Sequence, residues 1–143
     1  MSDFSEVLTE LDQLESELEA IRVVVDEGGE TYTGAPSARE AALRHLDAGM
    51  RHLVDSAWAL IEEADWDEPE DNLDAIEILA EEEVIPGPLA VTLTRLAEYA
   101  SEHGEEAGWV ADDDESYERL GEAAEAIAVY LEDVHQFLKQ WEA

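Results

Sequence analysis

Residues 4–25 read FSEVLTELDQLESELEAIRVVV, and this stretch decides the fold class. Its apolar residues recur at alternating steps of three and four, while Asp and Glu fill most of the positions between them. This spacing places one apolar stripe along an α-helix, and it is typical of the heptad seam along which helices pack lengthwise. The stripe consists of Phe4, Val7, Leu11, Leu14, Leu18, Ile21 and Val25.

The same helical spacing continues through the rest of the 143 residues, interrupted by Gly and Pro at the places where helices stop and start. No segment alternates with a period of two over enough residues to indicate a sheet. Pro69 is expected in the first turn of a short helix. The sequence therefore predicts a single all-α domain over residues 1–143, an up-and-down four-helix bundle with an additional short helix. The five helices are expected at about residues 2–26, 37–65, 69–83, 88–103 and 114–141.

Some apolar residues fall outside the predicted core stripes. We therefore expect a homodimer, because side chains of this kind often belong to a subunit interface. The residues concerned are Leu8, Val24, Val91, Tyr130 and Phe137.

The charge is strongly one-sided, with 39 Asp and Glu against 7 Lys and Arg, for a formal net charge of −32. Direct nucleic-acid binding is not expected, because phosphate contacts need clusters of basic residues. Binding to anionic membranes is disfavoured for the same reason, and no apolar run is long enough to span a bilayer. With no signal peptide and no cysteine, the expected compartment is the cytoplasm.

Three explanations compete for this charge. Disorder fails, because 45% of the residues are hydrophobic and they are periodic. An acidic decoy of a nucleic-acid-binding protein would gather its carboxylates in one strip or tail. A cytoplasm rich in salt would screen the repulsion, since the Debye length falls to ~3 Å at 1 M salt. Acids occur in every segment and Lys139 is the only lysine, which favours a halophile, such as a haloarchaeon, as the source.

His45 and His52 lie seven residues apart on one face of the second predicted helix. They could form a metal pair or a proton shuttle, or they could simply pack against a neighbouring helix or face solvent. Two helical turns place their Cβ atoms about 10 Å apart, too far for one metal ion to be held easily by both. The sequence contains no zinc spacing, phosphate-binding glycine loop or nucleophile elbow, so no metal or cofactor is expected.

Arg44 and Arg51 share this seven-residue spacing in the same helix. Ion pairs with Asp47, Asp55 or a neighbouring helix are the plain explanation. The alternative is a docking point for an acidic partner.

Four tryptophans could suggest stacking platforms for nucleic-acid bases. Because no basic residues accompany them, anchoring of the core and of loops is favoured. They are Trp58, Trp66, Trp109 and Trp141.

The order and lengths of these segments resemble the HepT-like proteins of the HEPN superfamily over nearly the whole chain. An acidic first helix and a linker lead to ALRHLDAGMRHLVDSAWALIEEA at residues 42–64. The passage EEEVIPGPLAVTLTRLAEYA follows at residues 81–100, and YERLGEAAEAIAVYLEDVHQFLKQW at residues 117–141 looks like the last helix of the family.

The resemblance implies a four-helix core with a fifth helix, homodimerisation, and often pairing with a minimal nucleotidyltransferase. Active members look like metal-independent ribonucleases that serve as toxins. Their signature is Arg-Asn, three variable residues and His, often followed by x-Tyr, near the end of the fourth helix. In that signature the Arg would hold phosphate and the His would transfer protons.

This chain departs from the signature. Ala100 and Ser101 stand where Arg-Asn is expected, Glu105 stands at the His position, and Ala107 stands at the Tyr position. The resemblance therefore implies a non-catalytic relative with a binding or structural role. Two alternatives remain, a diverged ribonuclease that uses Arg95 and His103 and the acidic decoy.

Overall fold

The computed structural model describes residues 3–29, 36–103 and 113–142. Within these ranges the chain is all-α and contains no strand, as the sequence predicts. Each helix begins and ends within three residues of its predicted position. The helices are α1 (Ser5–Glu27), α3 (Pro36–Glu63), α4 (Asn72–Glu81), α5 (Gly87–His103) and α6 (Asp113–Glu142).

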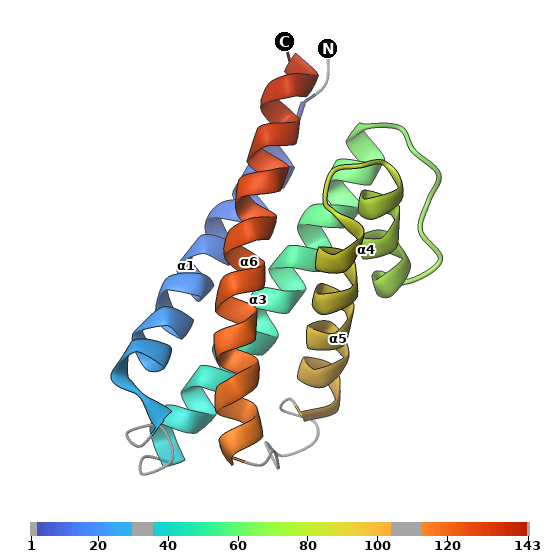
Figure 1. Cartoon of the computed structure of the whole chain (residues 1–143). Coiled ribbons are helices and arrows are strands. Elements are labelled where there is room, and N and C mark those ends of the chain that lie inside the picture. The colour runs from blue at the N-terminus through green and yellow to red at the C-terminus, as the bar shows by residue number, and fades with distance from the viewer. Residues whose placement is uncertain (1–2, 30–35, 104–112, 143) are drawn as a thin grey trace.

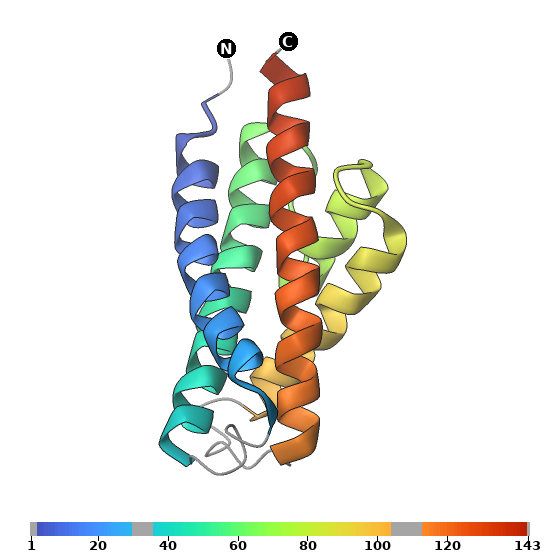
Figure 2. The same cartoon turned by 60° about the vertical axis from the view of Figure 1, so that its left-hand side comes forward.

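Four long helices, α1, α3, α5 and α6, run alternately down and up the molecule (Figure 1). The short α4 lies outside this bundle and packs against α3 and α5 (Figure 2). The start of α1 and the end of α6 lie at the same end of the bundle (Figure 2). The predicted up-and-down bundle with one additional helix is confirmed.

Helix α3 is central, because it contacts each of the other four helices. Its buried surface is accordingly wider than a single stripe and includes Leu43, Val54 and Ala59. Where α1 crosses α3, Gly49 lets the two backbones approach. A Cβ added there would lie 3.5 Å from Cβ of Glu17 and 3.7 Å from Cδ1 of Leu14.

Two helices end in left-handed residues that are not glycine. Asp65 after α3 and Glu83 after α4 both have φ of 62°. In each case the backbone N–H of the following residue donates a hydrogen bond to a carbonyl in the last turns of the helix. Trp66 donates to Ile61, and Val84 donates to Leu79. These bonds satisfy helix-end carbonyls in the Schellman arrangement and turn the chain sharply.

Two expectations are wrong in detail. Pro69 is not in the first turn of α4, because that helix begins at Asn72 and is capped by Asp71, which accepts from the backbone N–H of Asp74. Tyr130 is not an outward residue, because its side chain is fully buried between helices. No described helix is both long enough and apolar enough to cross a bilayer.

Candidate functional site

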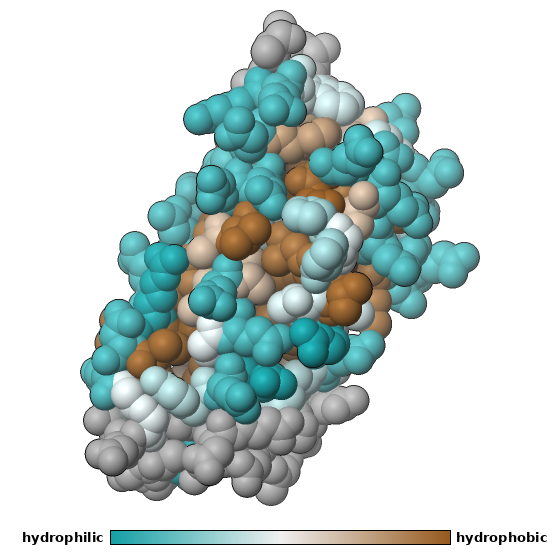
Figure 3. All heavy atoms as spheres, viewed as in Figure 1, coloured by the Kyte–Doolittle hydropathy of each residue, from teal (hydrophilic) through white to brown (hydrophobic). Residues whose placement is uncertain are grey.

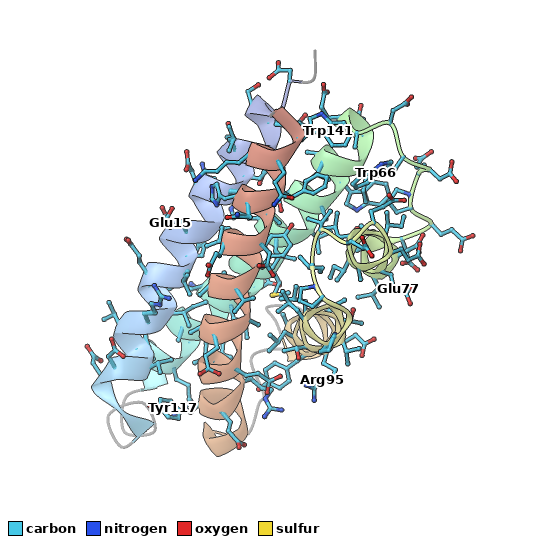
Figure 4. The ribbon with its side chains drawn as sticks, turned by 45° about the horizontal axis from the view of Figure 1, so that its top comes forward. Glu15, Trp66, Glu77, Arg95, Tyr117 and Trp141 are labelled. Atoms are coloured by element: carbon cyan, nitrogen blue, oxygen red, sulfur yellow. The ribbon has the colours of Figure 1, made fainter. Side chains whose placement is uncertain are left out.

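Arg95 lies on the exposed side of α5 near α6 (Figure 4). Its Nη2 is 3.3 Å from Oε1 of Glu122, and Nη2 of Arg119 is 3.4 Å from Oε2 of the same carboxylate. One glutamate of α6 thus bridges two arginines. A phosphate that approached Arg95 would have to compete with Glu122, which lowers its gain in free energy on binding.

The predicted pairing of Arg95 with His103 falls partly outside the described residues. His103 is the last residue of α5, but its side chain lies outside the described residues, as do Glu105 and Ala107. Ala100, which the resemblance matches to the signature's arginine, is 5% exposed and packs in the core. The described end of α5 therefore offers one exposed arginine, and that arginine is held by a glutamate.

His45 and His52 face α1, each against a glutamate. Nδ1 of His45 is 2.6 Å from Oε2 of Glu17, and Nδ1 of His52 is 2.8 Å from Oε2 of Glu10. The two glutamates are also seven residues apart. Because α1 and α3 run antiparallel, Glu10 meets His52 and Glu17 meets His45. Both histidines therefore pack against α1, and their hydrogen bonds with the two glutamates link α3 to α1.

Arg44 and Arg51 pair within their own helix. Nη2 of Arg44 lies 3.1 Å from Glu40, and Nη2 of Arg51 lies 2.9 Å from Asp47. Both arginine side chains are mostly exposed, at 60% and 71%. Exposed i,i+4 pairs of this kind contribute only about 0.3–0.5 kcal/mol to stability. The plain explanation of these arginines, local ion pairing, therefore accounts for what the structure shows.

Asp55 joins one of the two histidine–glutamate pairs. The ligand atoms of Glu10, His52 and Asp55 all lie within 4.8 Å of one another. His52 and Asp55 are one helical turn apart on α3, and Glu10 comes from α1. Sequence reasoning missed this group because it considered histidines only with each other. The matched seven-residue spacing of Glu10 and Glu17 was the available signal.

The tryptophans anchor packing. Nε1 of Trp58 donates to Oδ1 of Asn72 at 3.0 Å, tying α3 to the start of α4. Trp66 and Trp141 belong to a cluster with Phe4 and Phe137, with ring centroids 5.8–6.3 Å apart. Figure 4 shows Trp66 and Trp141 at one end of the bundle. Trp109 lies outside the described residues.

Tyr130 carries a hydroxyl in the middle of the core. It lies 2.7 Å from Oγ of Ser56 and 3.3 Å from the carbonyl oxygen of Leu53. Burial raises the pKa of Tyr130 above its usual value, although the hydrogen bond with Ser56 lowers it in part. A phenol held neutral and fully buried in this way is a structural group.

Exposed carboxylates occur on all five described helices, for example Glu6 on α1, Glu62 on α3, Glu77 on α4, Glu98 on α5 and Glu125 on α6. On the face seen in Figure 3, hydrophilic side chains surround hydrophobic ones that lie over and beside α6. The described acids do not follow one strip, so the acidic decoy lacks the feature that it requires.

Comparison with known proteins places this arrangement among known folds. No protein-family model matches the sequence, and no curated protein matches it. The cytosolic protein of unknown function YutE from Bacillus subtilis superposes with a TM-score of 0.80 at 19% identity, over 97% of this chain and 92% of that one. A tri-AMPylated Shewanella oneidensis HEPN toxin, solved in complex with an MNT antitoxin, superposes with a TM-score of 0.79 at 13% identity, over 95% and 99%.

A third structure, a mutant of the toxin-antitoxin MntA-HpeT, gives a TM-score of 0.79 at 13% identity, over 91% of this chain and 97% of that one. At such identities the likeness concerns the fold. The chain has the fold of the HepT-like HEPN proteins, over nearly its full length.

Proposed function

We propose that this protein is a non-catalytic HepT-like protein that forms a homodimer and binds a minimal nucleotidyltransferase, as in a toxin–antitoxin pair. The observation that carries the proposal is Ala100. This buried residue of α5 stands where the family signature has its phosphate-holding arginine. A methyl group inside the core can neither reach nor bind a phosphate.

The charges near α5 support the loss of activity. Arg95, the exposed cation of that helix, is paired with Glu122, which also holds Arg119. RNA would meet this spot on a protein whose net charge is −32. Long-range repulsion of a polyanion lowers both its association rate and its affinity.

The pairing with a nucleotidyltransferase rests on the fold, because the superposed HEPN toxin was solved with its MNT antitoxin. The homodimer rests on exposed apolar side chains, which commonly mark interfaces. The predicted Leu8 and Val91 are indeed exposed, at 44% and 61%, whereas Val24 and Phe137 are partly buried against the core. Exposed Val23, Val129 and Trp141 extend the set.

The setting that we propose is the salt-rich cytoplasm of a halophile such as a haloarchaeon, with the chain folded as one domain. The charge spread over every described helix is consistent with it. Screening within about 3 Å at molar salt would leave each carboxylate nearly independent of the others.

The test is co-expression of the chain with a nucleotidyltransferase encoded beside its gene, followed by purification and light scattering in molar KCl. We expect a stable complex that contains two copies of this chain. A monomer that recovers no nucleotidyltransferase would overturn the proposal.

The alternative enzyme, a diverged ribonuclease, makes a separate prediction. It requires RNA cleavage in molar KCl that is lost in His103→Ala and in Arg95→Ala. We expect wild type and both variants to show the same background. Arg51→Ala, which removes an exposed arginine of another helix, is the matched control for the change of charge.

A further inference from the structure

We propose that Glu10, His52 and Asp55 form a binding site for one divalent transition-metal ion of the zinc class. Their ligand atoms already lie within 4.8 Å of one another. Two donors on one tetrahedral zinc ion are about 3.4 Å apart, given bond lengths of about 2.1 Å. Small changes of side-chain torsion would therefore bring all three donors onto one ion.

The chemistry of the donors selects the class of ion. Imidazole suits zinc, copper, iron or nickel, whereas magnesium and calcium prefer oxygen alone. Two carboxylates neutralise the two charges of the ion, and water would complete its coordination. His52 and Glu10 keep only 29% and 25% of their side-chain surface exposed, so the ion would sit against the helix seam and not in bulk solvent.

The local electrostatics also call for a cation. In the described part of the chain Asp55 makes no hydrogen bond or ion pair, although Arg51 lies one turn before it. That arginine pairs with Asp47 instead. Two carboxylates from different helices thus lie within 4.8 Å of each other, and like charges at this distance repel. A bound ion would relieve the repulsion and fasten α1 to α3.

The chain supplies its own control one heptad away. His45 meets Glu17 in the same geometry, but Ala48 occupies the position that corresponds to Asp55. Among the described residues no third donor joins that pair. The two pairs differ by one carboxylate. The proposal therefore predicts metal binding at His52 and Glu10 and none at His45 and Glu17.

The experiment titrates the chelator-treated full chain with Co²⁺ in molar KCl, which suppresses loose association with the acidic surface. Visible absorption reports nitrogen and oxygen ligation of cobalt, and calorimetry with Zn²⁺ gives the stoichiometry. We expect one ion per chain, and binding that weakens as the pH falls because the imidazole must be unprotonated.

His52→Gln and Asp55→Asn should each weaken binding by at least about 10-fold, since loss of a direct ligand exceeds the 10–100-fold typical of outer partners. His45→Gln should bind as wild type does. Helical circular dichroism in molar KCl checks that each variant is folded. Ala48→Asp should raise the stoichiometry to two.

Zinc should raise the unfolding midpoint of wild type and of His45→Gln but not that of His52→Gln. The proposal is overturned if His52→Gln and Asp55→Asn bind cobalt as wild type does, or if His45→Gln loses as much affinity as they do. An unchanged stoichiometry in Ala48→Asp would contradict the role given to Asp55 as the third donor.

Discussion

The hydroxyl of Tyr130 is fully buried, and its partners are Ser56 and the backbone of Leu53. Removing it in Tyr130→Phe should lower the free energy of unfolding by about 1 kcal/mol, the net worth of a typical internal hydrogen bond. Chemical unfolding in molar KCl measures the change.

Ser56→Ala and the double variant complete a thermodynamic cycle. We expect a coupling of about 0.5–1 kcal/mol, because the two hydroxyls bond each other directly. A coupling of zero would show that the Leu53 carbonyl alone satisfies the tyrosine.

The carboxyl group of Asp133 on α6 has a raised pKa. Burial raises the pKa of its carboxyl above the ordinary value of 3.8, and the negative charge of Glu132 raises it further. The folded chain therefore holds this proton more tightly than the unfolded chain does. The ionised carboxylate lowers stability, and this loss grows as the pH rises from the ordinary value through the raised one.

Asp133→Asn should accordingly raise the unfolding midpoint near neutral pH, and the gain should vanish at about pH 3, where both states are protonated. Glu125→Gln removes an exposed charge from the same helix and controls for the general relief of repulsion. Equal gains in the two variants near neutral pH would contradict a specific effect at Asp133.

Gly49 lies where α1 crosses α3, and its lack of a side chain leaves room for α1. An added Cβ would meet Glu17, Leu14 and Ile127 at 3.5–3.9 Å, which is ordinary van der Waals contact. Gly49→Ala should therefore fit and stabilise by up to about 1 kcal/mol through helix propensity. Gly49→Leu should destabilise by about 1–3 kcal/mol, because it overfills the seam.

Gly121 on α6 is the matched control, since an added Cβ there meets nothing within 4 Å. Gly121→Ala should give the same gain as Gly49→Ala, and Gly121→Leu should be tolerated. Thermal unfolding followed at 222 nm distinguishes the two positions. If both leucine variants behave alike, close approach of α1 is not what Gly49 provides.

The whole molecule has a formal net charge of −32, and all five described helices contribute to one core. We expect its unfolding midpoint to fall steeply as KCl drops from molar to millimolar, because unscreened repulsion favours expanded states. Circular dichroism over a KCl series measures the effect. A chain equally stable in dilute buffer would refute adaptation to salt.

The fold class followed from the sequence because helix periodicity is a local property. Steps of three and four residues place apolar side chains on one face whatever the rest of the chain does. The five helices and the main apolar stripe along the long ones were predictable for this reason, from Val7 and Leu11 on α1 to Val134 and Leu138 on α6.

The tertiary structure alone decided which helix faces meet. The pairing of His52 with Glu10 and the bridging of two arginines by Glu122 depend on the register and rotation of helices distant in sequence. Tyr130 was predicted outside because its helix was considered as one stripe, whereas α6 contacts α1, α3 and α5 and buries a wider face. Periodicity determines the surface that each helix buries, but the partner of each side chain is set by packing between elements, which no local pattern contains.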